Sequence, residues 1–214
     1  MRVGVLGGTF DPVHRGHTYL AQAVLEAFDL SRVNLMVSGI PPHKEPGEIS
    51  SSHHRYAMLE IELSTQHSLF PSRWELDQPA PCYTIKTLDH FKSTYPENEY
   101  CFVAGSDALQ ELHLWKGYDR LLEEHCLIFV QRPGFNVDLT RLHLPETIGQ
   151  RIQSIGEGEY PDIRAGVSFL TPLKPPAISA SSIRSMLASG KEPTPEFLSP
   201  EVLKYITGHQ LYEE

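Results

Sequence analysis

The segment Gly7–His17, which reads GGTFDPVHRGH, holds the densest grouping of residues that could do chemistry. Its two glycines allow the backbone to approach a ligand closely, and a helix starting beyond them would offer unpaired N–H groups to a phosphate. His14 and His17 are three positions apart, so on a helical turn their imidazoles point the same way. The pair could therefore hold one anionic group, although His-x-x-His spacing by itself also occurs often on solvated helix faces.

A strand, a turn and a helix must position this segment. Arg2–Leu6 is an apolar, β-branched run that ends at two glycines, which is typical of a buried strand entering a turn. From Gly16 onward apolar residues recur on one helical face, at Leu20, Val24, Leu25 and Phe28. In an open α/β sheet such a turn lies at the carboxyl ends of the strands, where ligands bind.

The rest of the chain alternates in the same way. Further strands are expected over Val33–Val37, Tyr100–Val103, Leu127–Val130 and Val167–Leu170. Helices are expected after a cap at Ser51 or Ser52, over 84–95, from Gly105 to about Leu112, over 118–124 and 181–188, and from a Ser199 cap to Gly208; Leu142–Ile155 could include another. This alternation favours a single α/β domain over residues 1–214 with a doubly wound, mostly parallel sheet.

Composition limits the partners of the protein. The 214 residues carry 18 Lys and Arg against 27 Asp and Glu, a formal charge of −9 at pH 7. Such an acidic chain lacks the basic footprint of a general nucleic-acid binder, so any anion must be held by a local positive pocket. No apolar stretch approaches the ~20 residues of a membrane helix, and no signal peptide is expected before the first strand.

The cysteines indicate a reducing compartment. Cys82, Cys101 and Cys126 are odd in number and lack Cys-x-x-Cys spacing, so neither a disulfide framework nor a zinc ribbon is indicated. We therefore expect a cytoplasmic protein in which Cys101 and Cys126 are small buried residues. An oligomer is possible, and the sequence leaves the oligomeric state open.

Several blocks of the chain resemble one family, in that family's order. The chain has no Walker A sequence and no Gly-x-Gly-x-x-Gly fingerprint. Instead, His14–His17 after Gly-Thr-Phe-Asp resembles the signature of the His-x-Gly-His nucleotidylyltransferase superfamily, and its full spelling resembles bacterial nicotinate-nucleotide adenylyltransferases. The other matching blocks are Pro41–Lys44, Arg55–Met58, Tyr83–Leu88, Gly105–Trp115, Arg132–Gly134, Ile178–Arg184, Pro200–Ile206 and Leu211–Tyr212. The resemblance leaves out only the stretch around Phe135–Gly166, and Lys86 departs from it because the family usually has an acidic residue there.

The resemblance implies a Rossmann-like fold and an activity in NAD biosynthesis. The activity would be adenylyl transfer from ATP to nicotinate mononucleotide, which yields deamido-NAD and pyrophosphate, with Mg²⁺ bound mainly through the ATP phosphates. The C-terminal helical part, starting near Ile178, would complete the ATP site. Neither a nucleic acid nor a membrane is implied as a partner, and no side chain is assigned as a metal ligand.

The resemblance also assigns the site residues. The catalytic residues would be His14, His17 and Arg184. ATP would be bound by these three together with Gly7, Gly8, Thr9, Phe10, Gly105, Asp107, Ser181 and Ser182. The mononucleotide would be bound by Lys44, Thr84, Asp107, Trp115, Lys116 and Arg132, with Trp115 stacked on the pyridine ring. Taken alone, the same residues also suit ordinary roles, such as a Ser-capped helix, a cap at Asp107 or a core tryptophan.

Other functions stay open at this point. A member of the same superfamily could use nicotinamide mononucleotide or phosphopantetheine as the acceptor, although phosphopantetheine adenylyltransferases are shorter and lack the Gly105–Trp115 block. A class I aminoacyl-tRNA synthetase would need tRNA-binding appendages and a less acidic chain. A non-catalytic nucleotide-binding regulator would be expected to have lost the histidines, whereas His14 and His17 are both present.

Overall fold

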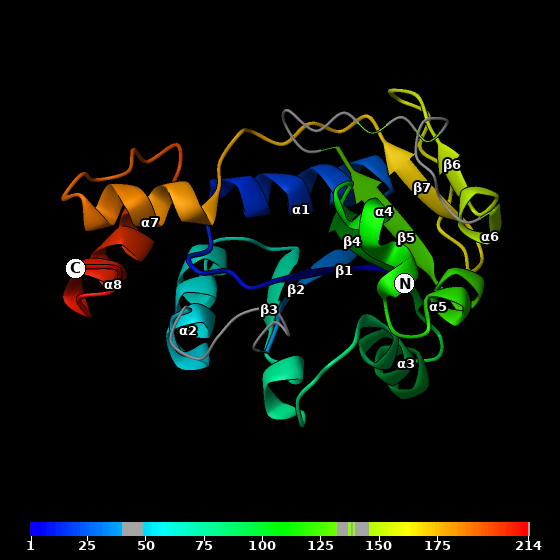
Figure 1. The fold of residues 1–214 in the computed structure, drawn as a ribbon, viewed down its shortest axis with the longest axis horizontal. Coiled ribbons are helices and arrows are strands. Elements are labelled where there is room, and N and C mark those ends of the chain that lie inside the picture. The colour runs from blue at the N-terminus through cyan, green and yellow to red at the C-terminus, as the bar shows by residue number, and fades with distance from the viewer. Residues whose placement is uncertain (40–48, 132–136, 138, 140–145, 214) are drawn as a thin grey trace.

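One seven-stranded sheet organises the protein (Figure 1). The structure is a computed structural model that describes residues 1–39, 49–131, 137, 139 and 146–213. Every strand pair is parallel, and the strand order is β3-β2-β1-β4-β5-β7-β6. The strands are β1 (Arg2–Gly8), β2 (Arg32–Val37), β3 (Leu69–Ser72), β4 (Glu99–Gly105), β5 (Cys126–Val130), β6 (Ile152–Ser154) and β7 (Ser168–Thr171).

Helices cover both faces of this sheet. Those that pack on one face are α1 (Arg15–Ala27), α2 (Ser52–Leu63), α7 (Ala180–Ala188) and α8 (Pro200–Gly208). Those that pack on the other are α3 (Thr84–Thr94), α4 (Ala108–Glu111), α5 (Tyr118–Glu124) and α6 (Glu146–Gly149). Two 3-10 turns, η1 (Trp74–Asp77) and η2 (Leu112–Leu114), complete the described elements. The expected doubly wound α/β fold is therefore confirmed.

The strands and helices that the periodicity predicts are present, with three differences. Two strands were not predicted: β6 has only three residues, and β3 is a four-residue edge strand that contains Pro71. A proline within an apolar run argues against a strand, so the sequence around Pro71 is typical of a loop. Proline is nevertheless tolerated at a sheet edge, where its missing N–H removes no hydrogen bond between strands. The helix expected from Gly105 to about Leu112 ends where expected but begins later, because α4 spans Ala108–Glu111, and the 3-10 turn η2 follows it.

Serines cap three of the helices, two of them at the expected positions and one at a different serine. Ser51 and Ser199 cap α2 and α8, as expected, by accepting hydrogen bonds from His54 N and Val202 N. The helix expected to begin at Ser181 starts one residue earlier, and its cap is Ser179, whose hydroxyl accepts from the backbone N–H of Ser182 at 3.1 Å.

Strand β1 lies at the point where the direction of the winding reverses. From β1 the chain adds β2 and β3 on one side, and β4, β5 and β7 lie on the other. The carboxyl ends of β1 and β4, at Gly8 and Gly105, therefore meet at one edge of the sheet. Such a switch point is the usual ligand crevice of an open parallel sheet, and the GGTFDPVHRGH segment lies there.

Two of the cysteines are core residues, as the sequence predicts. Cys101 on β4 and Cys126 on β5 are register partners, and both are almost completely buried. Burial raises the pKa of Cys126 to about 12, so this thiol stays protonated at neutral pH. Within the described ranges, no helix is both long and apolar enough to cross a membrane.

Candidate active site

The glycines at the end of β1 make room for two aromatic rings. A Cβ added at Gly7 would lie 3.0 Å from Cζ of Phe102, and one added at Gly8 would lie 2.9 Å from Cζ of Phe10. Phe10 is only 1% exposed, and its ring meets the ring of His17 edge-on, with centroids 4.9 Å apart. The side chain of Phe10 therefore supports His17 from the core. The contact of Phe10 with ATP stays a prediction, and the burial of the ring leaves the backbone of Phe10 to make it.

The two histidines of the motif form a stacked pair. Their ring centroids are 3.7 Å apart with an interplanar angle of 24°, which confirms that His14 and His17 point the same way. The backbone N–H of His14 donates to Nδ1 of His17 at 3.2 Å. Because Nδ1 of His17 accepts, a neutral His17 carries its proton on Nε2 and can donate it to an anion.

Gly16 explains the spacing of the motif. A Cβ at this position would lie 3.0 Å from Nδ1 of His14, so a larger residue would push against the imidazole. The same Cβ would lie 3.5 Å from Cβ of Ile178, just before α7. Gly16 therefore lets the His14 ring lie against the start of α1 while the segment leading to α7 packs on the same turn.

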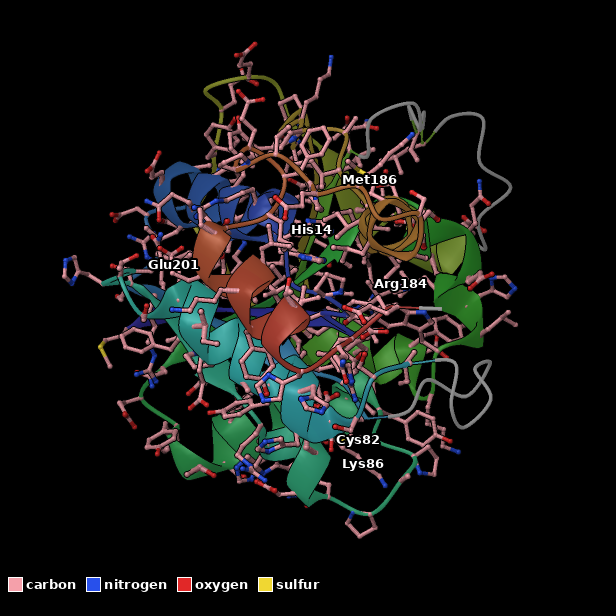
Figure 2. All side chains as sticks on the ribbon, turned by 90° about the vertical axis from the view of Figure 1, so that its left-hand side faces the viewer. His14, Cys82, Lys86, Arg184, Met186 and Glu201 are labelled. Atoms are coloured by element: carbon pink, nitrogen blue, oxygen red, sulfur yellow. The ribbon has the colours of Figure 1, made fainter. Side chains whose placement is uncertain are left out.

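Arg184 reaches the motif from α7. Its Nη1 donates to the backbone carbonyl of Asp11 at 2.6 Å, and its Nη2 donates to Oγ of Ser181 at 3.4 Å. Figure 2 labels Arg184 and His14 in one view of the molecule. The structure thus brings the three expected catalytic residues to one edge of the sheet.

The serines at the start of α7 are exposed, but one hydroxyl is already engaged. The Ser182 hydroxyl donates to the backbone carbonyl of Ser179 at 2.7 Å, whereas Ser181 accepts from Arg184. The Ser181 hydroxyl can therefore donate to a phosphate without losing a bond, and Ser182 would contribute chiefly through its backbone N–H or after rotating its hydroxyl.

Of the described residues expected to bind the mononucleotide, Trp115 packs against a ring of β4, and its turn lies near Thr84. Trp115 is half-buried, and its ring meets Phe102 edge-on with centroids 6.0 Å apart. Phe102 is also the ring that fills the space above Gly7, so it links Trp115 to the end of β1. A Cβ at Gly117 would lie 3.8 Å from Ile85, which places the Trp115–Gly117 turn against the first turn of α3, where Thr84 lies.

For the other residues singled out in the sequence, the structure gives mainly their exposure. Asp107 is half-buried just after Gly105, and Lys116 is exposed. Lys86 is exposed as well, with Nζ 5.7 Å from the centroid of the Tyr83 ring. The remaining two, Lys44 and Arg132, lie outside the described residues.

A buried polar network under the motif was missed by the sequence reasoning. Arg55 is 1% exposed, and its guanidinium donates to the backbone carbonyls of Thr9 at 2.8 Å, Ser38 at 2.9 Å and Ser50 at 3.1 Å. Burial lowers the pKa of Arg55, and the negative charge of the neighbouring Asp11 opposes that shift. Arg55 thereby ties the β1–α1 turn to the end of β2 and to the start of α2. The only feature of the sequence that pointed to Arg55 was its place in the Arg55–Met58 block.

One group of side chains away from this site could approach a cation. Ligand atoms of Asp89, Glu124 and His125 lie within 4.8 Å of one another, on α3 and at the end of α5. Arg120 forms ion pairs with both Asp89 and Glu124, so the carboxylates already have a cationic partner. The cluster therefore reads as a surface ion-pair network.

Comparison with known proteins agrees with this geometry. The cytidylyltransferase-like family model matches residues 5–186, so the chain is a nucleotidyltransferase by family. The chain is 33% identical to a "Probable nicotinate-nucleotide adenylyltransferase" of Shewanella baltica (strain OS195), over 99% of both chains. It is 35% identical to a protein of that name from Desulfatibacillum aliphaticivorans, over 99% of this chain and 100% of the relative. The chain belongs to the nicotinate-nucleotide adenylyltransferase family.

Solved structures share the fold. The nicotinic acid mononucleotide adenylyltransferase of Plasmodium falciparum, solved in complex with NaAD, superposes with a TM-score of 0.73 at 19% identity, covering 99% of this chain and 97% of that one. The same Plasmodium falciparum enzyme complexed with APC gives a TM-score of 0.72. At this identity the likeness concerns the fold.

Proposed function

We propose that the protein transfers the adenylyl group of ATP to the 5′-phosphate of nicotinate mononucleotide, giving deamido-NAD and pyrophosphate. The observation that carries this proposal is the placement of the stacked His14 and His17 pair next to Arg184 at the switch point of the sheet. Three cationic or proton-donating groups at one edge would supply the local positive charge that an acidic chain needs to hold a triphosphate. The activity places the chain in NAD biosynthesis.

The chemistry requires positioning and charge stabilisation more than a nucleophile from the protein. A phosphate oxygen of the mononucleotide attacks the α-phosphorus of ATP, and the bond from that phosphorus to the bridging oxygen of pyrophosphate breaks in line with it. Nε2 of His17, the imidazole of His14 and the guanidinium of Arg184 then stabilise charge on the transferred and leaving oxygens.

The backbone and polar groups around these residues would bind the two nucleotides. Around the ATP phosphates and ribose we place Gly7, Gly8, Thr9, the backbone of Phe10, Gly105, Asp107, Ser181 and Ser182. Around the mononucleotide we place Thr84, Asp107, Trp115 and Lys116, together with Lys44 and Arg132. Trp115 would stack on the pyridine ring, and Asp107 would accept from a ribose hydroxyl. In this arrangement α7, which lies beyond residue 178, completes the ATP site.

The donor set at the site fits a Mg²⁺ ion that is carried by ATP. The imidazoles of His14 and His17 and the guanidinium of Arg184 offer no oxygen ligand, and the buried carboxylate of Asp11 already accepts bonds from Tyr212 and Ser50. Mg²⁺ prefers oxygen ligands and keeps several waters, so the phosphates would hold most of its coordination sphere. The ion would supply neutralising charge to the triphosphate, and the protein would orient the complex.

The decisive experiment measures pyrophosphate release from ATP and Mg²⁺ with nicotinate mononucleotide, nicotinamide mononucleotide or phosphopantetheine as the acceptor. We expect release with nicotinate mononucleotide and much slower release in His14→Ala and His17→Ala. We expect native rates in His53→Ala, because His53 is an exposed histidine on α2. Release only with phosphopantetheine would show that phosphopantetheine, and not nicotinate mononucleotide, is the acceptor. ATP binding without release for any acceptor would favour a non-catalytic regulator.

A further inference from the structure

Three segments of the chain converge on Asp11, a carboxylate that is only 2% exposed. The Tyr212 hydroxyl donates to Oδ1 at 2.6 Å, and the Ser50 N–H lies 3.3 Å from both carboxylate oxygens. Arg184 approaches from a third direction and bonds the backbone carbonyl of Asp11 at 2.6 Å. Residues more than 170 positions away in the chain, Arg184 and Tyr212, therefore share one partner.

The contact between Arg184 and Asp11 is unusual for an arginine next to a carboxylate. A guanidinium and a carboxylate prefer a bidentate pair with donor–acceptor distances of about 2.7–2.9 Å. Here Nη1 of Arg184 is 4.0 Å from Oδ2 of Asp11 and bonds the carbonyl instead. The carboxylate already accepts from Tyr212 and Ser50, and the charge of buried Arg55 lies close to it. Arg184 and Asp11 therefore form only a long ion pair, without a hydrogen bond between guanidinium and carboxylate.

Tyr212 is held in place at a cost to the backbone. It follows α8 in the C-terminal tail, where Gln210 has a φ of 52° and Tyr212 a φ of 64°. Non-glycine residues rarely adopt these left-handed values, so the surrounding contacts must outweigh the strain. Leu211 N donates to Ile206 O at 3.0 Å, and the Tyr212 hydroxyl supplies the bond to Asp11. Burial raises the pKa of Tyr212, so its hydroxyl remains a donor at physiological pH.

We propose that Tyr212 is a positioning residue for ATP binding. Its hydroxyl donates to Oδ1 of Asp11 and so keeps the long 4.0 Å ion pair between this carboxylate and Arg184 from closing into a short, hydrogen-bonded one. The N–H groups of Arg184 that do not bond Asp11 or Ser181 then stay available for the triphosphate. Without the Tyr212 hydroxyl, Asp11 would turn toward Arg184 and compete with ATP for the guanidinium. This inference rests on the proposed function, in which Arg184 binds the ATP phosphates.

The test is a double-mutant cycle on MgATP binding, measured by calorimetry so that no turnover is required. The variants are Tyr212→Phe, Arg184→Ala, the combination of both, and Tyr205→Phe. The last is the matched control, because the Tyr205 hydroxyl on α8 also has a polar partner, Nδ1 of His54 at 3.0 Å, but lies outside the proposed site. Thermal unfolding fixes a temperature at which every variant is folded.

We expect Tyr212→Phe to weaken MgATP binding by about three- to tenfold, the size of one partly exposed charge contact. We expect Tyr205→Phe, and Tyr212→Phe in the Arg184→Ala background, to change binding by less than about twofold, because Tyr212 would act only through Arg184. Unchanged binding in Tyr212→Phe, or equal weakening in both backgrounds, would overturn the inference and leave the proposed function intact. If Arg184→Ala does not weaken ATP binding, both the role of Arg184 and this inference fail.

Discussion

Gly16→Ala should separate activity from stability. Gly16 is buried in the first turn of α1, between the two histidines of the motif. The added methyl carbon would lie 3.0 Å from Nδ1 and 3.1 Å from Cε1 of His14. Favourable contacts between such atoms begin at about 3.5 Å, so the imidazole must move by roughly half an ångström. His14 is only 5% exposed and stacks on His17, so the displacement passes to both rings.

The size of the effect follows from this displacement. A shift of about 1 Å in a positioned group can cost ~10² in rate, so half of that should cost about tenfold or somewhat more. Tenfold corresponds to about 1.4 kcal/mol in the transition state. The free energy of unfolding should change less, because two effects of the added methyl group oppose each other. Overpacking costs about 1–3 kcal/mol, but alanine is favoured over glycine inside a helix by about 1 kcal/mol.

The assay compares kcat for pyrophosphate release with the melting temperature of the same preparations. Gly208→Ala is the matched control, because a Cβ at this helical glycine of α8 would meet nothing within 4 Å. We expect Gly208→Ala to turn over at the native rate and Gly16→Ala to be slower although it is folded. Native turnover in Gly16→Ala would refute the idea that Gly16 holds the His14 ring in its working position.

Three further outcomes are expected. His17→Ala should slow turnover by ~10² to 10³ with a near-native melting temperature, because one preorganised stabiliser of phosphate charge is lost; near-native kcat would remove His17 from the mechanism. Lys86→Asp should change the KM for the mononucleotide by less than about tenfold, because the side chain is exposed and screened; a larger rise would place Lys86 in the site. Trp115→Ala should weaken nicotinate and nicotinamide mononucleotides alike, whereas Thr84→Val should lower the preference for the acid in kcat/KM, because it removes a donor to the carboxylate. Equal kcat/KM for the two mononucleotides in the native protein would contradict the last expectation.

The sequence by itself determined the elements and the place of the chemistry. Apolar periodicity placed β1 and α1 and therefore the GGTFDPVHRGH turn between them, because these patterns depend only on neighbours a few residues apart. The alternation of strands and helices was enough to predict a parallel, doubly wound sheet, since right-handed crossovers leave few other topologies. The same spacing argument predicted the common direction of His14 and His17, which the stacked rings confirm.

Only the tertiary structure decided how the motif is supported. Local pattern could not show that Gly7 and Gly8 lie under the rings of Phe102 and Phe10. Nor could it show that buried Arg55 holds the turn by donating to backbone carbonyls. It also could not show that Asp11 accepts a hydrogen bond from Tyr212, which lies 201 positions away in the chain. Buried charges are stable only where hydrogen-bond partners converge on them, and those partners come from distant parts of the chain. The packing of the whole fold sets the positions of these partners, and a short stretch of sequence does not reveal that packing.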